Sequence, residues 1–401
     1  MTDIASRLEE LRDRGLYRRL RLISGPQGPR VTLDGKQVLL LCSNDYLGFA
    51  NHPRVRSAAA EAAMRWGAGA GASRLISGNM QPHSRLEKRL AAFKGYESAL
   101  LFGSGYLANI GAISALAGRD EVVFSDELNH ASIIDGCRLS RAETFVYRHG
   151  DIDHLTWGLR AAGDRGALIV TDGVFSMDGD VAPLERLAEL SRRHRCRLMV
   201  DEAHATGVLG PGGRGSVAAA GLSGEVDLVM GTLGKALGSY GAYVCASREL
   251  SEYLLNTARS FIFSTAPPPP VAAASLAALE LLEAQPHRVE QLAENAATLR
   301  TALSAEGLAV GSSETQIVPV EVGGAARTME LSERLLERGV FAQGIRPPTV
   351  AEGSSRLRFT VMSTHRGAEL ERAAKFAGET ARELGIAASP APAKPPVAIA
   401  A

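Results

Sequence analysis

Short apolar runs alternate with amphipathic helical stretches from about residue 95 onward, and this alternation constrains the fold more than any other feature. Residues 184–193, for example, repeat apolar side chains at helical spacing between two such runs. This rhythm is typical of βα units, in which parallel strands alternate with helices that cover both faces of a sheet. We therefore predict an α/β fold with a mostly parallel sheet, whose apolar strands include residues 122–124, 167–170, 198–200, 228–230 and 242–244.

A proline run marks the passage from this region to a second domain. Residues 267–270 are all proline, which cannot lie inside a helix but can begin one. The Ala- and Leu-rich residues 271–284 then predict a long connecting helix. The predicted parts are an N-terminal helix and arm, a large domain, a smaller C-terminal α+β domain and a disordered Ala/Pro-rich tail, over residues 1–45, 46–285, 286–387 and 388–401.

Composition narrows the class of partner and the compartment. Acidic and basic residues balance at 44 each, so no overall charge attracts nucleic acid or an anionic membrane surface. The N-terminus lacks the apolar core of a secretory signal, and no stretch is long and apolar enough to span a bilayer. We therefore expect a cytoplasmic protein that acts on small molecules. Its four cysteines are far apart and form no CxxC pair or metal-ligand spacing, so we expect reduced thiols and no metal site: Cys42, Cys137, Cys196 and Cys245.

Lys235 is the first candidate for chemistry. It lies in residues 231–238, GTLGKALG, directly after an apolar strand, in a chain with only six lysines against 38 arginines. Glycines let a ligand approach the backbone, and burial lowers the pKa of an amine so that it can form a Schiff base. A lysine in a surface turn is the alternative for this stretch taken alone.

Asp201 and His204 follow another apolar strand, in the run LMVDEAH. A carboxylate at the end of a buried strand is expected to face a cation. In pyridoxal 5'-phosphate (PLP) chemistry the ring nitrogen stays protonated beside such an aspartate, which makes the ring an electron sink. Asp201 suits this role, and His204 is placed to reach the phenolic oxygen of the ring. The alternative is a strand-end aspartate that only caps a helix.

Three further stretches contain candidate site residues, although each indicates a site less strongly than Lys235 or Asp201. Residues 103–109, GSGYLAN, form a glycine-rich turn that opens a helix, where backbone N–H groups can bind phosphate. His130 follows the strand at 122–124, where its ring could stack on a planar cofactor, although a lone histidine is more often packed. Ser176 adds a polar group at the carboxyl end of a strand, where open α/β sheets bind ligands.

These motifs in this order resemble the α-oxoamine synthase family of fold-type I PLP enzymes. The resemblance runs from Arg18 and residues 43–48, SNDYLG, to about residue 366. It implies a PLP-dependent acyltransferase that joins an amino acid to an acyl-CoA with loss of carbon dioxide. It also implies a homodimer whose active sites lie at the subunit interface.

The resemblance assigns a role to each site residue. Lys235 forms the covalent link to the cofactor, Asp201 pairs with the pyridine nitrogen, and His130 stacks on the ring and polarises the thioester carbonyl. These three are the implied catalytic residues. The other implied cofactor-binding residues are Ser176 and His204 beside the ring oxygen, Gly105, Tyr106 and Thr232 on the phosphate side, and Ser264 and Thr265, which would reach the phosphate bound to the partner subunit.

The substrates implied by the resemblance are L-alanine and pimeloyl-CoA, or another pimeloyl thioester. Residues 344–350, GIRPPTV, followed by RLR at 356–358, are similar to the biotin-pathway members of the family. Consecutive prolines fix φ and hold nearby side chains in one orientation, which suits a specificity loop, although a structural turn is the alternative. Arg358 matches the arginine that clamps the amino acid carboxylate, and the further substrate residues are Arg18, Asn44, His130, Arg346 and Thr349.

Two rival functions stay open on the sequence alone. A sister enzyme that uses glycine or another acyl-CoA would keep every cofactor residue and differ only in its pocket. A protein that binds PLP but has lost catalysis would have no use for the full set of Lys235, Asp201, His130 and His204. The partner of Arg74, in ASRLI, is also open.

Overall fold

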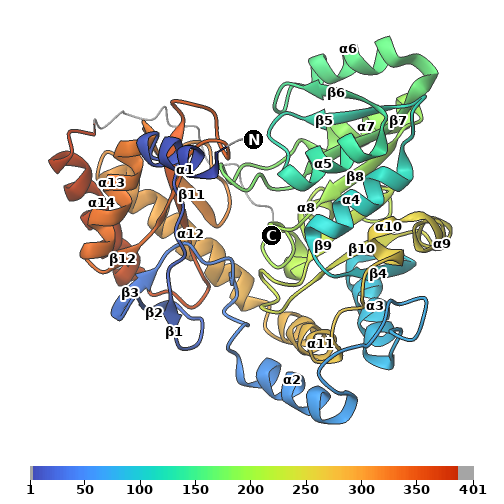
Figure 1. The fold of residues 1–401 in the computed structure, drawn as a ribbon, viewed down its shortest axis with the longest axis horizontal. Coiled ribbons are helices and arrows are strands. Elements are labelled where there is room, and N and C mark those ends of the chain that lie inside the picture. The colour runs from blue at the N-terminus through green and yellow to red at the C-terminus, as the bar shows by residue number, and fades with distance from the viewer. Residues whose placement is uncertain (1–2, 387–401) are drawn as a thin grey trace.

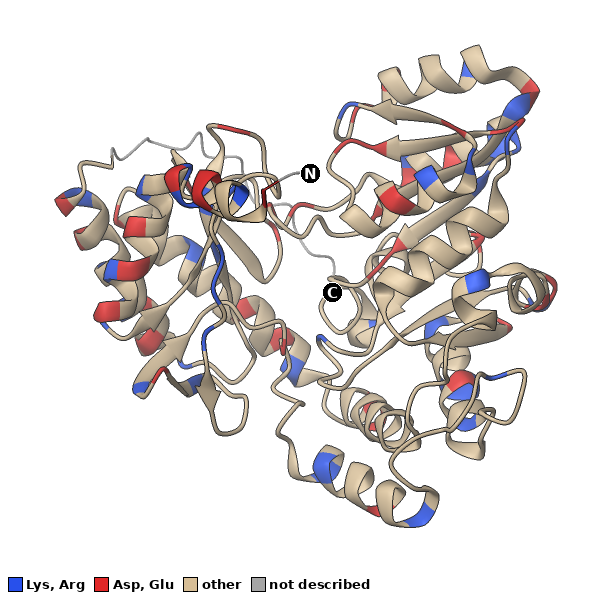
Figure 2. Cartoon of the chain, in the orientation of Figure 1, with Lys and Arg blue, Asp and Glu red and all other residues tan. Residues whose placement is uncertain are grey.

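The computed structural model describes residues 3–386, so the predicted disordered tail lies outside the described residues. Figure 1 shows two bodies: a large one built around a wide sheet and a smaller one that contains both the N-terminal arm and the C-terminal part of the chain. No helix among the described residues is long and apolar enough to cross a membrane. Lys and Arg side chains are interspersed with Asp and Glu over the helices of both bodies (Figure 2), in agreement with the balanced net charge.

A seven-stranded sheet forms the large body. Its spatial order is β4-β10-β9-β8-β7-β5-β6, and only β10 runs antiparallel to its neighbours, so the prediction of a mostly parallel α/β fold is confirmed. The strands are β4 (Ser98–Phe102), β5 (Val122–Asp126), β6 (Glu143–Tyr147), β7 (Gly166–Asp172), β8 (Arg197–Asp201), β9 (Leu228–Thr232) and β10 (Ala242–Ala246).

Helices cover both faces of this sheet, which explains why the strands read as continuous apolar runs. On β8, Met199 packs in one core cluster while Leu198 and Val200 pack in the other, as the two-residue period of a strand requires. One face is covered by α4 (Gly105–Leu116), α5 (Ala131–Ser140), α9 (Arg248–Thr257) and α10 (Arg259–Ile262). The other carries α6 (Ile152–Ala162), α7 (Leu184–His194) and α8 (Ser216–Ala219).

Three helices extend the large body beside β4. α11 (Pro269–Ala284) begins in the proline run, as predicted, and packs against α2 (Pro53–Trp66) and α3 (Gln81–Lys94). The open question about Arg74 is answered here, because its guanidinium donates to both carboxylate oxygens of Glu87 at 2.8 and 2.9 Å. Glu87 also accepts from the Leu101 backbone N–H, so Glu87 ties α3 to β4, and Arg74 has a structural role as its partner.

The smaller body contains two sheets. One has the order β11-β14-β13, from β11 (Ile317–Gly323), β13 (Gln343–Ile345) and β14 (Ser355–Thr360), and packs with α12 (His287–Ala305), α13 (Ala325–Glu337) and α14 (Gly367–Glu383). In the other, the N-terminal strands β1 (Ile23–Ser24), β2 (Arg30–Leu33) and β3 (Lys36–Leu40) pair with β12 (Val340–Phe341). The arm that follows α1 (Ile4–Asp13) is therefore hydrogen-bonded to the C-terminal part of the chain.

Candidate active site

The candidate residues gather at the carboxyl edge of the large sheet. Asp172, Asp201 and Thr232 are the last residues of β7, β8 and β9, which are neighbours in the sheet. Parallel strands bring their carboxyl ends to one edge, and this is where open α/β sheets bind ligands. The register pairs Asp172 directly with Asp201, so two buried carboxyl groups meet at this edge.

Lys235 lies in the loop of residues 233–241, which joins β9 to β10. The loop is closed by a hydrogen bond from the Leu233 N–H to the Gly241 carbonyl, and Gly238 adopts a φ of +60° that favours glycine. The Lys235 Nζ lies 2.9 Å from the His204 Nε2. Burial lowers the pKa of Lys235 to about 8, although the charges of Asp201 and Asp172 oppose the shift. An amine with this pKa is a usable nucleophile and base near neutral pH.

Asp201 is held as an acceptor by two donors. Its carboxylate accepts from the Asn109 side-chain amide at 2.7 Å and from the Ala203 N–H at 2.8 Å, and the residue is 2% exposed. The neighbouring Asp172 accepts from the His130 N–H at 2.7 Å, and burial together with the Asp201 charge raises its pKa well above the usual value. The edge therefore offers a fixed carboxylate beside a lysine amine of lowered pKa.

The start of α4, beside the end of β9, is a candidate site for an anion. Ser104 caps this helix, accepting from the Leu107 N–H at 3.2 Å, so the first-turn amides at Gly105 and Tyr106 face outward. A Cβ on Gly105 would lie 2.8 Å from the Thr232 methyl group, which makes glycine necessary and places Thr232 beside the helix start. The Tyr106 side chain is directed away, since its hydroxyl donates to Asp135.

His130 and Ser176 border the same edge. His130 caps α5, and its Nδ1 lies 2.7 Å from the Ser132 hydroxyl, which accepts from Asn109 at 2.8 Å. Because Asn109 also donates to Asp201, hydrogen bonds connect His130 to Asp201 through Ser132 and Asn109. Ser176 belongs to the loop after β7, and its carbonyl accepts from the Arg358 guanidinium on β14.

Some of the predicted substrate residues lie in the smaller body, and only some of these lie near one another. Arg346 lies at the end of β13, donates to the Tyr17 carbonyl at 2.7 Å, and has a buried Nε with no acceptor among residues 3–386. Burial, with the charge of Arg18, lowers the pKa of Arg346, so these two arginines lie near each other. Thr349 is exposed, and so is Thr265, which pairs with Ser73 through an isolated bridge away from Lys235.

These residues fit PLP. Asp201 supplies a fixed carboxylate that would pair with a pyridinium, and Lys235 supplies an amine that would form the covalent link. The start of α4 with Thr232 would hold a phosphate. The sequence motifs did not single out Asn109, Asp172 and Tyr46 as site residues. Asn109 and Tyr46 stand inside motifs that were quoted for other residues. Asp172 lies two residues beyond the predicted strand 167–170 and is the last residue of the observed β7, so its position just after an apolar run was the available signal.

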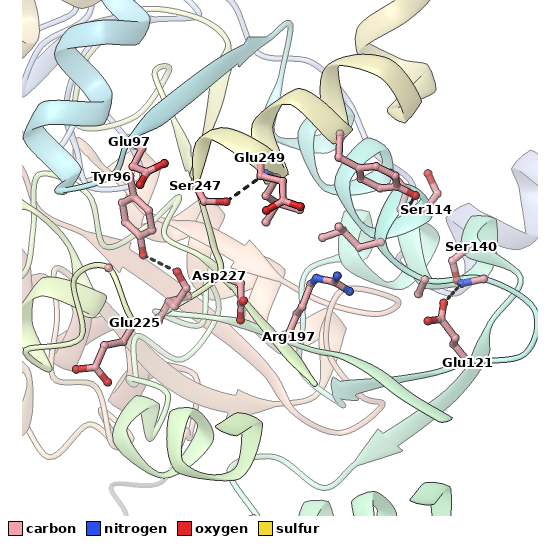
Figure 3. A pocket seen from close by; sticks show the side chains of 18 of the residues that line it. Tyr96, Glu97, Ser114, Glu121, Ser140, Arg197, Glu225, Asp227, Ser247 and Glu249 are labelled. Carbon is pink, nitrogen blue, oxygen red and sulfur yellow. Dashed lines mark hydrogen bonds between the residues drawn. The ribbon is translucent and has the colours of Figure 1, made fainter. Parts of the chain in front are cut away.

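A separate concavity lies elsewhere and is not this site. It has an open volume of about 1210 Å³ and is lined by Tyr96, Glu97, Arg197 and Asp227, near the amino ends of β4, β8 and β9 (Figure 3). Tyr96 donates to the Val226 carbonyl at 3.0 Å there. Its lining contains neither Lys235 nor Asp201, and it lies at the edge opposite to the one that binds ligands in such sheets.

Comparison with known proteins agrees with this geometry. Residues 36–376 match the family of class I and II aminotransferases. The chain is 56% identical to 8-amino-7-oxononanoate synthase of Citrifermentans bemidjiense, over 96% of this chain and all of that protein.

Two solved structures share the fold over most of the chain. A serine palmitoyltransferase variant from S. paucimobilis, with a bound PLP–myriocin aldimine, is 31% identical with a TM-score of 0.91 over 96% of this chain and 98% of that one. An 8-amino-7-oxononanoate synthase from Francisella tularensis is 29% identical with a TM-score of 0.76 over 87% of this chain and 99% of that one.

Proposed function

Since this chain belongs to the class I and II aminotransferase family, and within it to the 8-amino-7-oxononanoate synthases, we propose how its residues perform that reaction. The reaction is the decarboxylative condensation of L-alanine with pimeloyl-CoA to 8-amino-7-oxononanoate, CoA and carbon dioxide, a step of biotin biosynthesis. PLP is the cofactor. The observation that carries the assignment of roles is the lysine amine of lowered pKa beside a fixed, buried carboxylate at one sheet edge.

Bound PLP supplies an electron sink for the bond that breaks at the amino acid Cα. Lys235 would hold PLP through Nζ, and its free amine would take up the α-proton at the same atom. Asp201 would keep the ring nitrogen protonated, because its carboxylate is fixed by hydrogen bonds from Asn109 and Ala203. His130 would contact the ring and donate toward the thioester oxygen, where negative charge develops. Ser176 and His204 would contact the phenolic oxygen, and Gly105, Tyr106 and Thr232 would hold the phosphate.

Arg358 is proposed to bind the carboxylate of alanine, whose orientation decides which Cα bond is weakened. We expect Arg358→Ala to weaken alanine use by about tenfold or more while the KM for pimeloyl-CoA changes little, because only one substrate loses a charge-assisted contact. Steady-state kinetics with each substrate varied in turn measure this. Equal losses for both substrates would contradict the assignment. Lys88→Ala, an exposed change on α3, is the control.

The loop from Arg346 to Thr349 is proposed to shape the acyl pocket and to recognise the distal carboxylate of the pimeloyl chain. The buried, unpartnered Nε of Arg346 and the nearby charge of Arg18 support a site for an anion. We expect pimeloyl-CoA to exceed its methyl ester and an unsubstituted acyl-CoA of equal length by about tenfold in kcat/KM. Three equal rates would mean that the distal carboxylate is not recognised.

The amino acid specificity is tested in the same assay. Turnover of pimeloyl-CoA with L-alanine is compared with turnover with glycine and L-serine. A clear preference for alanine separates this activity from that of sister enzymes. Absence of turnover with every amino acid and acyl-CoA, in protein that binds PLP, would favour a binding protein without catalysis.

The homodimer with shared active sites and the cytoplasmic location are also parts of the proposal. Ser264 lies beside the exposed Thr265, and neither side chain hydrogen-bonds to Lys235 among residues 3–386, which suits residues that reach the phosphate bound to the partner subunit. The four cysteines are all unpaired thiols, as is usual in a reducing compartment. Light scattering on the purified protein measures the oligomeric state.

A further inference from the structure

A buried chain of hydrogen bonds leads from Lys235 away from the sheet edge. The Lys235 Nζ lies 2.9 Å from the His204 Nε2, and the His204 Nδ1 lies 2.6 Å from the Tyr46 hydroxyl. That hydroxyl lies 3.1 Å from the Asn44 Oδ1. Tyr46 is fully buried and His204 is 6% exposed, so bulk water does not compete for these contacts. No step of the reaction described above uses the Tyr46 hydroxyl.

The donors in this chain can be assigned one by one. Burial, with the positive charges of Lys235 and Arg358, lowers the pKa of His204 well below its usual value, so its ring is neutral and has one donor and one acceptor nitrogen. Below its pKa of about 8, Lys235 is an ammonium that can only donate. Nε2 must then accept, and Nδ1 carries the proton.

The far end of the chain agrees with this direction. The Nδ1–H donates to the Tyr46 oxygen, and the Tyr46 O–H is free to donate to the Asn44 Oδ1, which is an acceptor only. In this series of hydrogen bonds, every donor therefore faces an acceptor. A phenylalanine at position 46 could fill the same space but would leave a buried Nδ1–H without an acceptor.

Residues of the smaller body hold the backbone of both His204 and Tyr46. The Gln316 side-chain amide donates to the His204 carbonyl at 3.0 Å, next to β11. The Ser363 N–H, after β14, donates to the Tyr46 carbonyl at 2.7 Å. The smaller body therefore holds the backbone of both residues, and the Tyr46 side chain contacts the His204 ring through its hydroxyl.

We propose that Tyr46 is a positioning residue for this reaction: with Asn44 as its acceptor, it fixes the tautomer and orientation of His204, so that Nε2 remains an acceptor for the Lys235 ammonium. The inference rests on the proposed role of Lys235 as the reacting amine. It concerns groups of the chain itself, so cofactor-free protein can be used to test it. A result that contradicts the role of Tyr46 can then be distinguished from one that contradicts the catalytic role of Lys235.

The experiment compares Tyr46→Phe with Tyr147→Phe. Tyr147 is a matched control, since it is 1% exposed and its buried hydroxyl has no partner in the part of the chain that the structure describes. Nitrogen chemical shifts of the His204 imidazole, in cofactor-free full-length protein labelled with 15N-histidine at pH 7, report which ring nitrogen carries the proton. We expect a protonated Nδ1 in the unchanged protein and in Tyr147→Phe, and a loss of that state in Tyr46→Phe.

Two further measurements test the effect of Tyr46→Phe on the reactivity of Lys235. The pH dependence of its reaction with added PLP is expected to shift to lower pH in Tyr46→Phe, because the ammonium loses its acceptor. In the holoenzyme, kcat is expected to fall about tenfold, as for loss of one buried hydrogen bond, while the KM for pimeloyl-CoA stays the same. Unchanged imidazole shifts and an unchanged Lys235 profile in Tyr46→Phe, or equal changes in Tyr147→Phe, would overturn the proposal.

Asn44→Ala keeps the test decisive if Tyr46→Phe fails to fold. Without the Asn44 oxygen, the Tyr46 hydroxyl loses its acceptor and can donate to the ring instead, so its proton competes with the one on Nδ1. We expect the imidazole signals to move toward a protonated Nε2. Shifts identical to those of the unchanged protein would show that Asn44 and Tyr46 do not set the tautomer.

Discussion

Replacing Lys235 with alanine is expected to abolish the covalent link to PLP and to lower kcat by roughly 10⁴-fold, the upper end of the usual effect of a positioned base. The reason is geometric as well as chemical. The Lys235 amine, with its pKa near 8, faces the buried carboxyl groups of Asp201 and Asp172. The other five lysines lie outside the segment that joins β9 to β10.

Borohydride reduction followed by peptide mapping measures the link directly. We expect the unchanged protein and Lys88→Ala to carry reduced cofactor on Lys235, and Lys235→Ala to carry none. The visible absorbance of the linked cofactor should disappear in the same variant. A map that places the cofactor on another lysine would remove the central assignment, whatever the loss of turnover.

The sequence predicted the large sheet well because a parallel sheet is buried on both faces. Its strands were visible as apolar runs, and residues 198–200 are indeed inside β8. Strand direction was less visible. The run at 242–244 has the same apolar character as the others, but β10 is antiparallel to β4 and β9, since a short loop that contains Lys235 joins β9 to β10.

The smaller sheets were harder to predict, because their pairing is not local in sequence. β3 pairs with β12, about 300 residues further along the chain, and β12 has only two residues, Val340 and Phe341. A two-residue strand leaves no periodic pattern to recognise. The predicted N-terminal arm is therefore part of a sheet that no local pattern could indicate.

The candidate site also contains some residues that the local sequence reveals and others that depend on contacts between distant segments. Lys235 and Asp201 stand in distinctive contexts at strand ends, so sequence was sufficient to single them out. Asn109 and Tyr46 matter through partners that lie 92 and 158 positions away, Asp201 and His204. Spacing along the chain carries no information on such contacts until the sheet has brought the segments together.

Lys94 illustrates this limit, because nothing in its local sequence distinguishes it from an ordinary lysine at the end of a helix. It ends α3 and is 4% exposed, and its ammonium pairs with the fully buried Glu202, which directly follows Asp201. The ammonium also donates to the Arg214 carbonyl. The Glu202 carboxylate accepts in addition from the Val217 N–H at 2.7 Å. The pair therefore lies in the core directly behind the site.

Lys94→Met is expected to lower the free energy of unfolding by about 3–5 kcal/mol, because it leaves a buried carboxylate without its cation. Urea denaturation at fixed protein concentration, without cofactor, measures the change. Arg192→Met is the control. Its partner is Glu225, both side chains are at least half exposed at 60% and 50%, and such a surface pair contributes at most about 1 kcal/mol.

The double variant Lys94→Met, Glu202→Gln separates the missing charge from the loss of packing. Removing the uncompensated carboxylate should recover part of the lost stability, since replacing both members of a buried pair costs less than removing one. Because Glu202 is bonded to Asp201 and its N–H donates to the Met230 carbonyl on β9, the recovered stability should be accompanied by tighter PLP binding than in the single variant. A single variant as stable as Arg192→Met would mean that Glu202 finds another partner, and the pair would not hold the strand end behind the site.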